Sequence, residues 1–252
     1  AAGEAGIDVT RAGIDLRLEG GEAQIGWAGG AFNVAVNGKP LSWPGSAQLS
    51  AGDRLSVTPG EEGNYGYLRF GARLDLPPVL GSQATSTRAR LGGLEGRALV
   101  AGDVLTLVGE GGAPSSVPAV PAVEGQIRFI WGLHADYFPP GLRRSFTEAA
   151  FRVTPVMDRM GVRLADEDRV FAGASILSLV SEPIQPGDIQ ILGDGTPIVL
   201  MRDHQPTGGY PRIGTVISAD LDRFAQIRPG TQLAFTPVSV EHAHRLLRSS
   251  HS

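Results

Sequence analysis

Glycine and proline interrupt this chain so often that it cannot be built from long helices. The 252 residues include 35 glycines and 18 prolines, and these two residue types end short apolar runs along the whole chain. Glycine weakens helices and strands, and proline lacks the N–H group that would continue a helix. Short apolar runs bounded by such residues are typical of strands joined by turns. The sequence therefore predicts a mainly β protein.

Composition excludes several classes of function. Apolar residues make up 42% of the chain, which is enough for a sizeable core and argues against disorder along the whole length. The net charge of −4 argues against a general nucleic-acid binder, since phosphate binding needs a basic face. The chain has no cysteine, which excludes disulfides, thiolate metal sites and cysteine nucleophiles.

The sequence contains no predicted membrane-spanning segment. The uncharged run within residues 170–181 is far shorter than the roughly 20 apolar residues that a spanning helix needs. The first residues lack the basic start and apolar segment of a signal peptide. We therefore expect a cytoplasmic protein.

Residues 109–125 predict a boundary between two lobes. This stretch is rich in glycine, proline, alanine and serine, and its only charged residues are Glu110 and Glu124. Such a composition is typical of a linker. We expect a first lobe at residues 1–110, a linker at 111–124, a second lobe at 125–240 and a tail at 241–252.

Short strands are predicted in both lobes. Asn37-Gly38 indicates a two-residue hairpin turn, because both residues tolerate positive φ. Helices are predicted within residues 137–150 and 220–227, and the tail from Val240 can form a frayed helix. The expected strands are residues 23–27, 32–36, 54–57, 65–70 and 104–108 in the first lobe, and 126–131, 189–192, 198–201, 214–218 and 232–235 in the second.

The densest group of polar and glycine residues is Asp203 to Arg212. Paired glycines allow a ligand to approach the backbone closely and expose N–H groups to an anion. The polar side chains of this segment would then supply an acid, hydrogen-bond donors and a cation. The alternative is a simple β-hairpin loop between residues 197–201 and 213–218.

Two further groups of residues are candidates for chemistry. Arg159 and Arg163 lie near Asp158 in sequence and can bind a carboxylate or phosphate, although taken alone this cluster fits a surface ion pair better. Glu182 can act as a general base or a magnesium ligand, or belong to an ordinary turn. The sequence has neither a P-loop nor a GxSxG nucleophile elbow, and its histidines lack zinc-ligand spacing.

Several short motifs occur in a fixed order between about residues 71 and 235. Residues 203–212 resemble D-x-Q-T-T-G-G-Y-P-K/R, and residues 158–164 resemble D-R-M-G-Y-R-L. Residues 78–85 resemble P-x-V-L-G-S-x-S/A-T, residues 181–187 resemble S-E-x-x-x-x-G, and residues 190–199 resemble I-Q-x-x-x-D/N-G-x-P-I. In this order they resemble the allophanate hydrolase subunit 2 family. That family includes the C subunit of bacterial 5-oxoprolinase, urea-amidolyase-related proteins and the carboxyltransferase region of urea carboxylases.

This resemblance implies a mainly β fold of two cyclophilin-like β-barrel lobes. The chain departs from the family pattern in lacking the T-x-Q-D-x-G-R and G-x-x-x-G-A-M-D segments, so we expect the first lobe to be without its N-terminal segment. Pro206 replaces the usual threonine, Met157 replaces serine and Val162 replaces tyrosine. These departures affect the transfer of activity more than the transfer of fold.

The resemblance also implies a component of an ATP-dependent 5-oxoprolinase that acts with homologues of the A and B subunits, the latter from the allophanate hydrolase subunit 1 family. ATP with Mg²⁺ would act at the level of the complex. If Mg²⁺ met this chain, Asp158, Glu182 or Asp203 would hold it, but the chain is expected to have no metal site of its own. The catalytic candidates at matching positions are Asp158, Arg159, Glu182 and Asp203. The candidates for binding substrate or phosphate are Arg163, Gln190, Gln205, Thr207, Gly208, Gly209, Tyr210 and Arg212.

Two alternatives remain open. The first is the carboxyltransferase component of a biotin-dependent, urea-carboxylase-like system, which would need a biotin carrier and a biotin carboxylase. The second is a non-enzymatic regulatory protein that binds a homologue of the B subunit.

Overall fold

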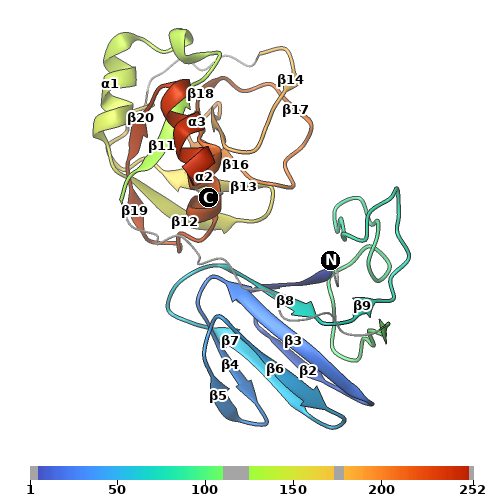
Figure 1. Cartoon of the computed structure of the whole chain (residues 1–252). Coiled ribbons are helices and arrows are strands. Elements are labelled where there is room, and N and C mark those ends of the chain that lie inside the picture. The colour runs from blue at the N-terminus through green and yellow to red at the C-terminus, as the bar shows by residue number, and fades with distance from the viewer. Residues whose placement is uncertain (1–4, 110–124, 173–178, 250–252) are drawn as a thin grey trace. The chain divides into compact units, whose positions relative to one another are not determined.

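The computed structural model describes residues 5–109, 125–172 and 179–249. The chain divides into two compact units, residues 1–120 and 121–252, each built mainly of β-strands (Figure 1). The mainly β architecture predicted from the sequence is therefore confirmed. The linker predicted at residues 111–124 lies outside the described residues. None of the helices within the described ranges is both long and apolar enough to cross a membrane.

The first unit contains two antiparallel four-stranded sheets that share one core. The strand order of one sheet is β1 (Gly6–Thr10), β8 (Tyr65–Phe70), β3 (Glu22–Gly29) and β6 (Gly45–Ser50). The other has the order β2 (Ile14–Arg17), β7 (Arg54–Pro59), β4 (Phe32–Val36) and β5 (Lys39–Leu41). A short ribbon pairs β9 (Arg73–Leu74) with β10 (Leu107–Val108).

Alternation of buried and more exposed residues places this core between the two sheets. In β3, Ala23, Ile25 and Trp27 are buried, whereas the residues between them are only partly covered. Such a period of two is the pattern of a strand with one face in the core. The indole N–H of Trp27 donates to the carbonyl of Ser42 at 2.8 Å, so this large buried ring leaves no polar atom unsatisfied.

The hairpin predicted at Asn37-Gly38 is confirmed. Val36 pairs with Lys39 across the turn, and Asn37 and Gly38 have φ values of 52° and 79°. Positive φ at both central residues defines the turn type that matches the twist of the flanking strands. The local chemistry of these two residues therefore sets the register of β4 and β5.

The second unit is an eight-stranded sheet that curls into a barrel. The last two strands lie at opposite edges of the sheet, and only Ala234 separates them in the chain, so the two edges must come close together. The strand order is β19 (Gln232–Leu233), β12 (Phe151–Met157), β13 (Gly161–Ala165), β16 (Pro197–Leu200), β15 (Asp188–Ile191), β18 (Arg212–Val216), β11 (Ile127–Trp131) and β20 (Phe235–Pro237).

Aromatic side chains fill the core of this barrel. Phe146, from α1 (Pro140–Glu148), is fully buried, and its ring lies 5.4 Å from that of Phe129 and 5.2 Å from that of Phe235. The helix α2 (Ser218–Ala225) adds Leu221 and Phe224 to the same core. The 3₁₀ turn η1 (Ala135–Tyr137) precedes α1, and α3 (Val240–Ser249) has no buried residue.

Three of the predicted strands differ from those observed. The strand predicted at residues 214–218 lies two residues earlier, as β18, because Ile217 is the N-cap of α2 and Ser218 is its first residue. The strand predicted at residues 104–108 is reduced to β10, because Val104 lies in an exposed segment where Arg97 and Asp103 form an ion pair. The strand predicted at residues 232–235 is split at Ala234 into β19 and β20, which lie at opposite edges of the barrel. The split at Ala234 is not visible in local sequence, because it follows from the pairing of β19 with β12 and of β20 with β11.

Candidate functional site

The second unit has a pocket of about 510 Å³ beside β13, β15 and β16. Its apolar lining includes Met160, Leu192, Ile198 and Leu200. Predicted site residues supply most of its polar lining, and they come from separate segments of the chain: Asp158, Arg163, Gln190, Gln205 and Tyr210. The structure thus brings together residues that are spread widely along the sequence.

Arg163 supplies the positive charge of this pocket. It is the only cationic residue among the described residues that line the cavity, and its side chain is exposed. Nearby, hydrogen bonds from Thr196 lower the pKa of Asp194, and the positive charge of Arg163 acts in the same direction. The guanidinium can therefore attract an anionic group of a ligand that enters the pocket.

Gln190 supplies a polar side chain that is excluded from solvent. It lies in β15, is 1% exposed, and its Nε2 has no hydrogen-bond partner within the described part of the chain. Gly208 lies against this amide: a Cβ at that glycine would lie 2.6 Å from Nε2. An unsatisfied buried donor costs about 1–3 kcal/mol. Because Nε2 is closed off from solvent, an acceptor on a ligand would recover this energy only after binding had opened a path to the amide.

Thr207 and Gly208 form a separate two-stranded ribbon next to the barrel. They make up β17 (Thr207–Gly208), which pairs with β14 (Glu182–Pro183). The segment 203–212 is therefore not the simple hairpin loop considered from the sequence, because β16 and β18 pair with opposite edges of β15 and not with each other. Gly209 extends the contact by accepting a hydrogen bond from the N–H of Leu179 at 2.7 Å.

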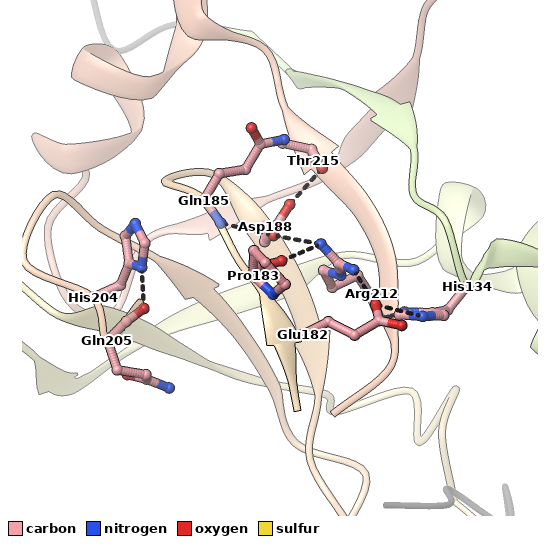
Figure 2. A network of polar contacts seen from close by, with 9 residues as sticks. All are labelled: His134, Glu182, Pro183, Gln185, Asp188, His204, Gln205, Arg212 and Thr215. Atoms are coloured by element: carbon pink, nitrogen blue, oxygen red, sulfur yellow. Dashed lines mark hydrogen bonds and ion pairs between the residues drawn. The ribbon is translucent and has the colours of Figure 1, made fainter. Parts of the chain in front are cut away.

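Arg212 is enclosed in a network that joins this ribbon to the barrel (Figure 2). Its guanidinium donates to Glu182 Oε2 at 2.7 Å and to the carbonyl of Pro183 at 3.1 Å, and it lies 3.5 Å from Asp188 Oδ2. The Arg212 side chain is only 9% exposed. Its charge is thus compensated inside the protein. Like Thr207, Gly208 and Gly209, it does not line the pocket that Arg163, Gln190, Gln205 and Tyr210 line.

His134 and Asp188 belong to the same network, although no sequence pattern had selected them. The backbone N–H of Arg212 donates to His134 Nδ1 at 3.2 Å, and His134 Nε2 lies 3.4 Å from Glu182 Oε2. Because Nδ1 accepts a hydrogen bond, the tautomer that fits this contact has its proton on Nε2, which faces the Glu182 carboxylate. Asp188 accepts hydrogen bonds from Thr215 Oγ1 and the N–H of Gln185.

The remaining catalytic candidates, Asp158, Arg159 and Asp203, already have partners within the protein. Asp158 Oδ1 accepts the backbone N–H groups of Met160 and Gly161 at 2.7 and 3.1 Å, which stabilises the turn into β13. Arg159 and Asp203 form an exposed ion pair at 2.8 Å. Among the described residues, no group of three or more histidine, aspartate or glutamate side chains is placed to hold a metal ion.

Comparison with known proteins identifies the family. Residues 1–237 match the family described as the carboxyltransferase domain, subdomain A and B. The chain belongs to this family. The C subunit of the 5-oxoprolinase of Haemophilus influenzae is 32% identical over 245 residues, which cover 97% of this chain and 78% of that protein. The family resemblance inferred from the motifs is therefore confirmed.

Solved structures of family members have the same fold. The Kluyveromyces lactis urea amidolyase matches with a TM-score of 0.85 and 25% identity, over 98% of this chain and 16% of that chain. The urea carboxylase of the same organism matches with a TM-score of 0.83 and 26% identity, over 98% of this chain and 24% of that chain. In these two large proteins, the region similar to this chain is a minor part of the whole.

Proposed function

We propose that this carboxyltransferase-domain protein is the C subunit of an ATP-dependent 5-oxoprolinase, acting with homologues of the A and B subunits. In the overall reaction, water opens the lactam C–N bond of 5-oxoproline to give the carboxylate and ammonium groups of glutamate, while ATP and a second water give ADP and phosphate. The match to 78% of the length of the Haemophilus influenzae C subunit supports this assignment.

The observation that carries the proposal is the combination of groups in the pocket. 5-Oxoproline is a small ring with a carboxylate, a carbonyl and three apolar or weakly polar ring carbons. Arg163 offers a guanidinium for the carboxylate, and Gln190 offers an amide that lacks a partner for the carbonyl. Ile198 and Leu200 offer an apolar surface for the ring. Such pockets, mostly apolar with a few placed polar groups, are typical of small-molecule sites.

The same pocket does not fit ATP. A triphosphate with its Mg²⁺ requires several cationic or amide donors and at least one carboxylate that is available to the metal. Arg163 is the only cationic residue among the described residues that line the pocket, and Arg212 is enclosed by Glu182 and Asp188. ATP would therefore act elsewhere in the assembled complex, and this chain would bind and orient the lactam.

The contribution of the chain is then electrostatic and geometric. A lactam carbonyl is a poor electrophile, and ATP supplies the activation that the assembled enzyme requires. Gln190 would donate a hydrogen bond to the carbonyl oxygen, where negative charge grows when the carbonyl carbon is attacked. Arg163 would fix the ring through its carboxylate, so that the carbonyl keeps one orientation. Both groups act without a change in their own protonation.

Phosphate release from ATP tests this proposal. The chain would be purified with its A and B homologues, and release would be measured with and without 5-oxoproline. We expect release that is stimulated by 5-oxoproline and is lost when this chain is omitted. A stable complex that releases no phosphate under either condition would contradict the proposal and would favour the regulatory binding function.

A second candidate is the carboxyltransferase component of a biotin-dependent system. The TM-scores of 0.85 and 0.83 to the urea amidolyase and the urea carboxylase of Kluyveromyces lactis favour it. The apolar pocket lining and the unpartnered Gln190 amide also suit the ureido ring of biotin. Avidin distinguishes the two candidates: it would abolish a biotin-dependent activity of the complex and would leave a 5-oxoprolinase unaffected.

A further inference from the structure

The ribbon of β14 and β17 supports one wall of the pocket from outside the barrel. Gln205 precedes β17 and Tyr210 follows it, and both line the pocket. The ribbon pairs through only two residues on each strand, and backbone hydrogen bonds from Ile184 to Pro206 at 3.2 Å and from Leu179 to Gly209 at 2.7 Å flank this pairing. So short a ladder cannot define a fixed position by itself. The position of this wall therefore depends also on its contacts with the barrel: the backbone N–H of Asp203 donates to Arg159 at one end, that of Ile191 donates to Pro211 at the other, and side-chain contacts act between these ends.

The main polar contact between ribbon and barrel is the pair Glu182–Arg212. Glu182 comes from β14, and Arg212 is the first residue of β18 in the barrel (Figure 2). Arg212 is also bonded to the carbonyl of Pro183, so one guanidinium holds both residues of β14. The Glu182 side chain, however, is 46% exposed, and a carboxylate in that environment can rotate away from a single cation.

His134 supplies the second contact that limits this rotation. Its ring is 7% exposed and is held from one side by the backbone N–H of Arg212 at Nδ1. The ring of Tyr137 packs on it with centroids 5.2 Å apart. Nε2 then faces the same carboxylate oxygen that Arg212 binds. One fixed imidazole thus connects the backbone of the barrel strand with the carboxylate of the ribbon.

We propose that His134 is a positioning residue. In its neutral form with the proton on Nε2, it orients the carboxylate of Glu182, so that the ribbon holds Gln205 and Tyr210 in place at the pocket. The anchoring of the ribbon stands on this geometry alone, whereas its effect on turnover rests on the proposed function. Without His134 the ion pair persists but is less oriented, and the pocket wall moves.

Three variants of one residue test the two contacts separately. His134→Asn keeps an acceptor near the Nδ1 position but has no group at the Nε2 position. His134→Gln is long enough to place its amide N–H near Glu182. His134→Ala removes both contacts. Hydrogen exchange of the backbone amides, followed by mass spectrometry, reports on the ribbon segments 179–185 and 203–211 and on the barrel strand β12 as a reference.

We expect about three- to tenfold faster exchange in the ribbon segments of His134→Ala and His134→Asn, with β12 unchanged, and recovery in His134→Gln. Equal exchange in all variants would overturn the proposal, and so would faster exchange across the whole barrel, which would indicate a merely structural role. In the complete complex, His134→Ala should raise KM for 5-oxoproline by a similar factor and change kcat little.

The two proposals can fail separately. If the wild-type complex shows no 5-oxoproline-dependent release of phosphate, the proposed function is wrong, but the exchange experiment still decides whether His134 anchors the ribbon. If the wild-type complex is active and His134→Ala alters neither exchange nor KM, the positioning role is wrong and the proposed function stands.

Discussion

Gly208 leaves room for the side chain of Gln190: a Cβ at residue 208 would lie 2.6 Å from Nε2 and 3.1 Å from Cδ1 of Ile184. The first distance is well inside van der Waals contact. The side chain of Gln190 in the barrel therefore fits only because residue 208 in the ribbon has no Cβ.

Gly208→Ala should therefore displace the Gln190 amide and weaken the binding of 5-oxoproline. We expect KM to rise about tenfold, which corresponds to the loss of roughly one hydrogen bond. Gly193→Ala is a matched control, because no atom lies within 4 Å of a Cβ at that position. An unchanged KM in Gly208→Ala would show that the amide of Gln190 is not used in binding.

Arg163→Gln should reduce the affinity for an anionic substrate. A charge-assisted hydrogen bond contributes about 1.5–3 kcal/mol, so we expect KM to rise about 10- to 100-fold. Arg202→Gln is the control, since that arginine pairs with Asp222 at an exposed position and does not line the pocket. If both variants behaved alike, overall charge and not a specific contact would govern binding.

Asp103 provides a pH-dependent contact in the first unit. Hydrogen bonds from Arg97, together with one from the N–H of Val100, lower the pKa of Asp103 from 3.8 to about 2. A carboxylate with a lowered pKa stabilises the folded state above its unfolded pKa, and this contribution is lost as the pH falls through the folded value. We expect the contribution to be constant above about pH 5 and to disappear between about pH 4 and pH 2.

NMR titration of the Asp103 carboxyl carbon measures this pKa directly. In Arg97→Gln the midpoint should move up towards 3.8, because the first and largest cause of the shift is removed. A midpoint that stayed near 2 in this variant would assign the shift to the backbone contact with Val100.

Phe146→Ala should destabilise the second unit strongly. The ring is fully buried and contacts several other aromatic rings, so its removal leaves a cavity that the barrel cannot easily close. We expect a loss of about 3–5 kcal/mol in the free energy of unfolding of this unit. Hydrogen exchange in urea, read on peptides from residues 127–131 and 151–157, separates its unfolding from that of the first unit.

Leu133→Ala serves as the control for this substitution, because Leu133 is 82% exposed and its truncation removes little buried surface. A small effect of Phe146→Ala, comparable to that of Leu133→Ala, would mean that α1 contributes little to the core.

Turn residues and alternating apolar residues in the sequence predicted those strands and turns whose structure depends only on neighbouring residues. The Asn37-Gly38 turn and the strands β4 and β8 follow from residue types within a few positions, and their predicted bounds agree with the structure. The order of the strands in the barrel could not be predicted in this way. The pairing of β13 with β16 and of β15 with β18 joins segments that are far apart in sequence, so no local pattern marks it.

The site was predictable in part for the same reason. Family motifs supplied Gln190, Arg163 and Tyr210, and the long-range pairing of β13 with β16 and of β15 with β18 then brought them to one pocket. His134 and Asp188 were missed because their roles depend on burial beside Arg212, which is far from His134 in sequence. One local signal was available: Asp188 and Gln190 are polar residues within an otherwise apolar strand, which is unusual unless they have partners.

The parallel pairing of β20 with β11 has a consequence for biosynthesis. The first strand of the second unit finds one of its two neighbours only when Phe235–Pro237 has been made. At about 5–20 residues per second, the ribosome leaves the nascent barrel open along this seam for several seconds. During that interval the free edge of β11 can pair with another extended chain, so a pause in translation between β11 and β20 would prolong the exposure to misassembly.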